Sequence, residues 1–112
     1  MLSWSSHETG EQIDLTALAD GRDGVGLEHG DALLRFGGAC AGTDDAELAA
    51  ARAALVATTD EAFMVDAAAV AANFEMMTRL ADGTGAAMPA ERLERSAAAI
   101  AVMRIYDLPS RR

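Results

Sequence analysis

The amino-acid sequence predicts an all-α fold, a small bundle of about four helices that follows an extended N-terminal arm. Three observations favour this fold. Alanine, the strongest helix former, occurs 26 times among 112 residues, whereas aromatic residues make up only 4%. From Glu28 onward, apolar residues recur at helical spacing, and residues typical of helix caps separate these stretches. The chain is also short enough to form one domain.

Charge and cysteine content exclude several classes of function. The formal net charge is -9, and the nine basic residues are all arginines. This balance disfavours nucleic acid and anionic membrane surfaces as partners, because both require clustered cations. No stretch approaches the roughly 20 apolar residues that cross a bilayer. A single cysteine, Cys40, allows no internal disulfide, so we expect a cytoplasmic protein.

Residues 1–27 are expected to form a loop-rich arm, and residues 28–112 a helical domain. Glycine, serine and aspartate are frequent in the arm, and Asp14 to Asp20 could form one short helical turn that ends at Gly21. The negative charge is uneven, because residues 1–60 hold eleven acids and three arginines, a net charge of -8. The acidity therefore belongs mostly to the first half of the chain.

Two shorter helices are expected first. In the helix over residues 28–41, Leu33, Phe36 and Cys40 share one face, while Gly37 and Gly38 indicate either a close helix approach or a break. The next helix begins near Asp44, which together with an acid three residues later resembles a capping box. This helix ends at residues 58–60. Its expected inner face consists of Leu48, Ala51 and Leu55.

A long helix is expected over residues 60–82, ended by Gly83 and Gly85. Two adjacent apolar stripes together span about 200° of its circumference, so we expect neighbours on most sides. One stripe has heptad-like spacing and consists of Phe63, Ala67, Val70, Phe74, Met77 and Ala81, and the other consists of Val65, Ala69, Ala72, Met76 and Leu80.

A last helix is expected to run from Pro89, at the first helical position, to about Leu108, where Pro109 stops it. Its inner face would consist of Leu93, Ala97, Ile100, Ala101, Ile105 and Leu108. Glu91 and Arg95 are spaced to form an i, i+4 ion pair.

Few residues indicate chemistry. Cys40 is a weak nucleophile candidate, since it falls late in a helix and in phase with apolar residues, which favours a buried structural cysteine. His29 is expected to have a surface or capping role, and an acid/base role beside Glu28 or Asp31 is the alternative. No spacing of histidines or cysteines predicts a metal site, and no glycine motif predicts a phosphate-bearing cofactor.

Asp66 and Asn73 are the least expected residues of the long helix. They are seven residues apart and fall near the centre of its apolar arc. A buried carboxylate must be paired, protonated or directed into a cavity. The pattern therefore favours a buried hydrogen-bond network or an oligomer contact, and a place on a ligand pocket wall is the alternative.

The long helix also carries a family resemblance. The sequence Val65-Asp66-Ala67-Ala68-Ala69-Val70-Ala71-Ala72-Asn73-Phe74, followed by Met77-Thr78-Arg79-Leu80-Ala81-Asp82-Gly83-Thr84-Gly85, resembles the late helix of the carboxymuconolactone decarboxylase and alkylhydroperoxidase D-like superfamily. The resemblance covers residues 30–88 and implies an all-helical, oligomeric protein. Peroxidase members of that superfamily use a Cys-x-x-Cys pair, whereas Gly37 and Thr43 stand three residues from Cys40 here.

Three functions follow as hypotheses. Because the redox cysteine pair is missing, the sequence favours a non-catalytic module that acts as a homo-oligomer or through a protein partner. The wide apolar arc of the long helix also favours self-association. The alternatives are a small peroxidase- or decarboxylase-type enzyme using Cys40 or a set of His29, Asp66 and Asn73, and a binder of a small apolar ligand.

Overall fold

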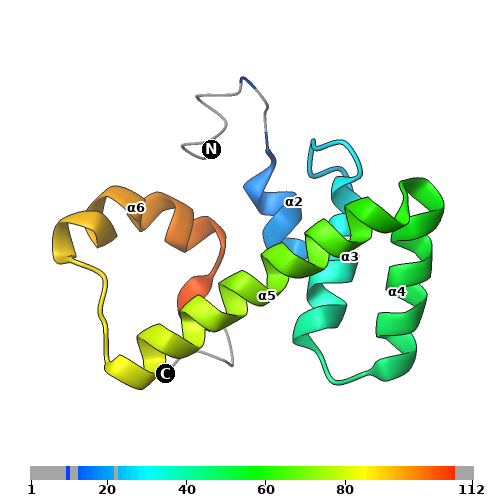
Figure 1. Cartoon of the computed structure of the whole chain (residues 1–112). Helices are drawn as coiled ribbons and strands as arrows, with labels where there is room; N and C mark the ends of the chain where they lie inside the picture. The colour runs from blue at the N-terminus through cyan, green and yellow to red at the C-terminus, as the bar shows by residue number, and fades with distance from the viewer. Residues whose placement is uncertain (1–9, 11–12, 22, 108–112) are drawn as a thin grey trace. The chain divides into compact units, whose positions relative to one another are not determined.

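The computed structural model describes residues 10, 13–21 and 23–107, and it confirms the all-α prediction. This part of the chain contains five α-helices, one short 3-10 helix and no strand (Figure 1). The elements are α2 (Leu15–Asp20), α3 (Gly30–Ala41), α4 (Asp45–Thr58), α5 (Glu61–Thr84), α6 (Ala90–Val102) and η1 (Ile105–Asp107).

The helices group into two compact units. The first unit is made of both ends of the chain, residues 1–30 and 88–112, and the second of residues 31–87. These units do not coincide with the segments 1–27 and 28–112 that the sequence distinguishes. Each unit is described by itself.

In the first unit, α2 is the short helical turn expected in the arm. The Asp14 side chain caps it by accepting hydrogen bonds from the backbone N–H groups of Thr16 and Ala17, at 2.9 and 3.1 Å. Gly21 ends it in the left-handed conformation, with φ 63°. Ala17 is buried, and the backbone N–H of Asp14 donates to the Val25 carbonyl at 2.9 Å, so this part of the arm is folded.

Helices α2 and α6 contact each other, and Arg104 joins the segments that follow them. Its Nη2 donates to the Ala19 carbonyl at 3.2 Å and to Asp20 Oδ1 at 2.7 Å. The expected helix end near Leu108 is wrong, because α6 stops at Val102 and Arg104 adopts a left-handed backbone with φ 50°. Leu108 and Pro109 lie outside the described residues.

Pro89 also differs from its expected position. It occupies the N-cap of α6 with φ -56° and ψ 142°, one residue before the first helical position. The Glu91–Arg95 ion pair is present at 3.6 Å, with both side chains exposed.

The core of the second unit lies among α3, α4 and α5. Phe36, Ala51 and Leu55 are buried, and Leu33 and Leu48 are packed against them. The inner faces expected for α3 and α4 are thus confirmed except at Cys40, which is exposed. Helix α3 continues through Gly37 and Gly38, and no atom lies within 4 Å of the position of a Cβ on either glycine.

The start of α4 departs from the expected capping box in one respect. Asp44 caps it as predicted, accepting hydrogen bonds from the backbone N–H groups of Ala46 and Glu47 at 2.9 and 3.0 Å. The Glu47 side chain instead accepts from Arg35 of α3, with 2.7 Å to Nε and 3.0 Å to Nη2. This bidentate pair links α3 to α4.

Helix α5 is much longer than its neighbours. Asp60 caps it by accepting from the Phe63 N–H at 2.8 Å, and Gly85 ends it with φ 69°, so Gly83 lies inside the helix. Its 24 residues span about 36 Å, against about 21 Å for the 14 residues of α4. The second half of α5 therefore extends past α3 and α4, as Figure 1 shows.

Candidate functional site

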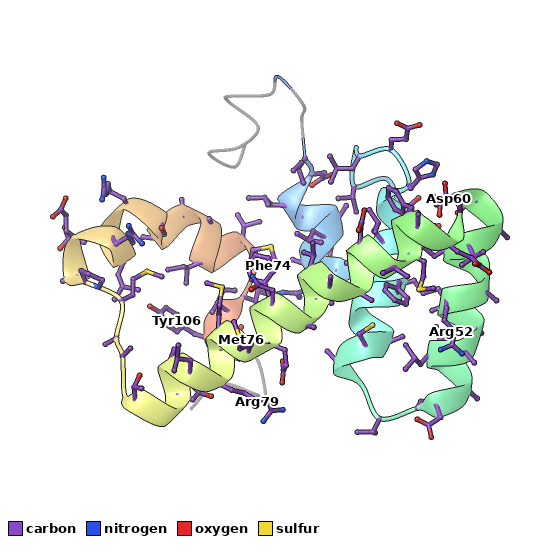
Figure 2. The ribbon with its side chains drawn as sticks, in the orientation of Figure 1. Arg52, Asp60, Phe74, Met76, Arg79 and Tyr106 are labelled. Atoms are coloured by element: carbon purple, nitrogen blue, oxygen red, sulfur yellow. The ribbon has the colours of Figure 1, made fainter. Side chains whose placement is uncertain are left out.

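The most unusual surface of the described chain is an exposed apolar face on α5. Six large apolar side chains of this helix are between 52% and 63% exposed. They define the α5 apolar face: Val65, Val70, Phe74, Met76, Met77 and Leu80. Figure 2 labels Phe74 and Met76 on the second half of the helix. Monomeric proteins rarely expose so many large apolar side chains in one patch.

This face is exposed because α3 and α4 pack on the other side of α5. The α5 residues packed against the core are Met64, Ala67 and Ala68. At 100° per residue these three cluster on one side, and the centre of the α5 apolar face lies about 150° away from them. No residue of α5 is buried. Within residues 31–87, neighbours therefore do not surround this helix on most sides.

Asp66 and Asn73 lie in the middle of the α5 apolar face. Both are exposed, so residues 31–87 contain no buried hydrogen-bond network around them, and the oligomer contact stays a prediction. The Asn73 Nδ2 lies 3.6 Å from the sulfur of Met77. Among the described residues, no hydrogen bond or ion pair is found for the Asp66 carboxylate.

A groove of about 490 Å³ runs between α3 and α5, next to the α5 apolar face. It is lined by Leu33, Phe36, Gly37, Phe63, Asp66, Ala67, Val70 and Ala71. The groove is apolar apart from the Asp66 carboxylate, which suits a hydrophobic side chain or a small apolar ligand. Asn73 is not among its lining residues.

Cys40 lines a second, wider groove of about 760 Å³. The predicted burial of this cysteine is wrong, because it lies near the exposed C-terminal end of α3. The same groove includes Glu75 and Arg79 of α5, which form an exposed i, i+4 ion pair at 2.7 Å. Neither a second cysteine nor a histidine lines this groove beside Cys40, so the lining contains no counterpart of a Cys-x-x-Cys pair.

His29 belongs to the first unit. It has a left-handed backbone with φ 57°, and its Nε2 lies 3.6 Å from Glu28 Oε1. Its side chain is 33% exposed, which fits the surface or capping role expected for it. Asp66 and Asn73 belong to the second unit, so the catalytic set proposed from the sequence draws on two units.

Among the described residues, the ion pair between Arg35 and Glu47 has clearly shifted pKa values. The hydrogen bond from Arg35, assisted by its charge, lowers the pKa of Glu47 below its ordinary value, and the same contact raises the pKa of Arg35. Both side chains are exposed, and the pair links two helices rather than lining a groove. Among residues 13–21 and 23–107, no group of acids, histidines and cysteines could hold a metal ion.

The comparisons with known proteins add no assignment: no protein-family model, curated protein or solved structure matches the chain. In the part of the chain that the structure describes, no helix is long and apolar enough to cross a membrane. Among the described residues 31–87, the fold is a small helical unit that leaves an apolar face of α5 exposed. The resemblance to the alkylhydroperoxidase D-like superfamily stays a prediction.

The wide apolar arc of the long helix already favoured self-association, and a second sequence signal indicates which end of the helix stays uncovered. Val65, Met76 and Leu80 were expected to contact neighbouring helices. The expected helices at 44–58 and 60–82 differ by about eight residues, or roughly 12 Å. Because the shorter helix cannot cover the longer one, the length difference indicates an uncovered end.

Proposed function

We propose that the chain is a non-catalytic helical module that assembles with copies of itself through the α5 apolar face. One observation carries this proposal: six large apolar side chains on one helix are more than half exposed. The face continues into the apolar groove between α3 and α5, which gives a second copy a concave edge to pack against. We also propose that the protein is cytoplasmic and that it is related to the alkylhydroperoxidase D-like superfamily.

The size of the face supports self-association. A helix of about 36 Å can form a long interface with a partner helix, and stable interfaces bury about 800 Å² per partner. Burying a large aliphatic or aromatic side chain contributes about 1.5–3 kcal/mol. If a partner covered all six residues, which are on average about three-fifths exposed, their burial would supply about 5–10 kcal/mol per copy before the costs of association.

The position of the remaining charges also favours an assembly surface. The ion pairs Glu75–Arg79 and Arg35–Glu47 lie outside the α5 apolar face. Asp66 is the only charged residue within it, so a partner helix would meet an almost neutral surface. The core of an interface is typically depleted in charge and enriched in Met and aromatic residues.

Light scattering with a concentration series tests the proposal. The wild-type chain is expected to exceed the monomer mass of 11.6 kDa, whereas Met77→Glu is expected to reduce the mass toward that value. Ala53→Glu on the exposed side of α4 adds the same charge outside the face and serves as the control. A wild-type chain that stays monomeric at the highest concentration would refute the proposal, as would an equal effect of both variants.

A second candidate function is supported by the groove between α3 and α5. Its volume of about 490 Å³ falls within the range of small-molecule sites, and its lining is apolar with a single carboxylate. An apolar ligand with one cationic or hydrogen-bonding group would fit this lining. An apolar fluorescent dye that binds the monomer but not the oligomer would favour this candidate if Gly37→Leu, which places a larger side chain in the groove, weakens that binding.

A further inference from the structure

The two polar side chains in the middle of the α5 apolar face complement each other chemically. Asp66 offers carboxylate oxygens that accept hydrogen bonds, and the Asn73 amide offers two N–H donors. Seven residues separate them, which is about 10.5 Å along the helix. They lie on the same side of α5 but are too far apart to bond to each other within one chain.

Covering the α5 apolar face makes these groups costly unless they find partners. A carboxylate or amide removed from water loses its hydration, and only a new hydrogen bond compensates for that loss. No residue of α3 or α4 supplies a described hydrogen bond to Asp66. The partner that covers the face must therefore bring a donor to Asp66 and an acceptor to Asn73.

A second copy of α5 meets this requirement in one orientation. In a parallel pair each residue faces its own copy, so the two Asp66 carboxylates would repel each other. In an antiparallel pair about a two-fold axis, residue i faces residue j and residue j faces residue i. Asp66 of each copy then faces Asn73 of the other, and both polar pairs are satisfied at once.

We propose, given the self-association argued above, that two copies pair through antiparallel α5 helices about a two-fold axis beside Ala69 and Val70. Asp66 of each copy accepts a hydrogen bond from Asn73 of the second copy. A shift of one helical turn in either direction would leave both polar groups facing apolar side chains. The two polar residues thus fix the register of the pair, as single polar residues do in coiled coils.

The residues of the face up to Met77 agree with this register, whereas Leu80 would lie opposite position 59, before the first residue of α5 in the second copy. Asp66, Val70, Asn73, Met77 and Leu80 are spaced 4, 3, 4 and 3 residues apart, which is the spacing of a helix-pairing seam. The register places Val70 against Val70 of the second copy and Met77 against residues 62 and 63. Ala69, beside the axis, is small enough to let the helices approach to about 8–9 Å.

Disulfide trapping in the full chain tests the register. In a Cys40→Ala background that keeps Asp66 and Asn73, we would introduce one cysteine at a time as Val70→Cys, Ala62→Cys or Met77→Cys and oxidise with copper phenanthroline in air. Covalent dimers would be measured on non-reducing gels, with Ala53→Cys as an exposed control on α4. Light scattering and circular dichroism of each reduced variant would verify its mass and its helical content.

The antiparallel register predicts a distinct pattern of cross-links. Val70→Cys is expected to form a covalent dimer alone, because its two copies are offset by about 1.5 Å along the helices. Ala62→Cys and Met77→Cys are each expected to cross-link at least tenfold less alone, since about 22.5 Å along the helices separates the two copies, but to cross-link when mixed, because residue 62 faces residue 77 in this register.

Two outcomes would overturn the register. In the first, Ala62→Cys cross-links to itself as fast as Val70→Cys, which indicates a parallel pair. In the second, the mixture of Ala62→Cys and Met77→Cys forms no more dimer than Ala53→Cys does. If light scattering shows a dimer in either case, the register alone is wrong. If the wild-type chain is a monomer, the proposed self-association fails together with the register.

Discussion

Val70→Ala separates the contribution of the α5 apolar face to assembly from its contribution to the single chain. The change removes two carbon atoms from a side chain that is 57% exposed. At about 0.8 kcal/mol per buried carbon, the two carbons carry about 1.6 kcal/mol in total. About 0.9 kcal/mol of this is available to a partner and about 0.7 kcal/mol is already gained within the chain.

The two contributions have different consequences. In a two-fold dimer both copies lose the intermolecular part, so the association free energy weakens by about 1.8 kcal/mol and Kd rises about 20-fold. Within the chain, the loss of about 0.7 kcal/mol is offset because alanine is a better helix former than valine by a similar amount. The free energy of unfolding of the dilute chain should therefore change little.

Sedimentation equilibrium measures Kd, and urea unfolding at a concentration far below Kd measures the stability of the chain. A Kd that rises by about 20-fold with unchanged chain stability would support a partner helix at Val70. An unchanged Kd would refute the reasoning, and so would a loss of chain stability of more than about 2 kcal/mol, which would place Val70 in the core.

Four further predictions concern the second unit. Leu55→Ala removes the most deeply buried side chain, 0% exposed, and should cost about 2–5 kcal/mol in urea unfolding; a loss below about 1 kcal/mol would contradict the packing of α3, α4 and α5. Asp44→Ala removes the α4 N-cap and should cost about 1 kcal/mol, with faster amide exchange confined to the first turn of α4. Arg35→Gln should raise the pKa of Glu47 toward its ordinary value of 4.5 in an NMR titration, because the hydrogen bond and charge that lower it are lost. Cys40 should react with iodoacetamide in the folded chain at a rate that urea barely changes, whereas a rate limited by unfolding would show that it is buried.

The pH prediction has a definite sign. The pKa of Glu47 is lowered in the folded chain, so the pair with Arg35 contributes to stability above the ordinary value of 4.5. That contribution is lost as the pH falls below 4.5 through the pKa of the folded chain. Arg35→Gln should therefore make the stability of the chain less sensitive to acid in that window. A variant with the same acid sensitivity as the wild type would show that the pair does not persist in solution.

The helices could be predicted from the sequence because their boundaries depend on local chemistry. Asp14, Asp44 and Asp60 all cap helices where a side-chain oxygen precedes an apolar stretch. Gly85 ends α5 because a left-handed residue without a Cβ is favoured there. The end of α6 was missed, because the left-handed conformation of Arg104 depends on its contacts with Ala19 and Asp20, more than 80 residues away in sequence.

The candidate site was predictable only in part. Asp66 and Asn73 attract attention because polar residues interrupt an apolar stripe, a feature that the sequence alone displays. Which side of α5 faces the core depends on where α3 and α4 pack, and hydrophobic periodicity cannot decide this when most of a helix is apolar. The exposure of Cys40 has the same origin, since it lies past the point where the neighbouring helices cover α3.

The first unit, which joins the two ends of the chain, has a consequence for the order of events during synthesis. Helix α2 leaves the ribosome early, but Arg104, which binds the Ala19 carbonyl, follows 85 residues later. At about 5–20 residues per second, α2 waits roughly 4–17 s for its partner. The contacts among α3, α4 and α5 close much shorter loops and need no later segment. Residues 31–87 should therefore fold first, before the contacts between α2 and Arg104 form.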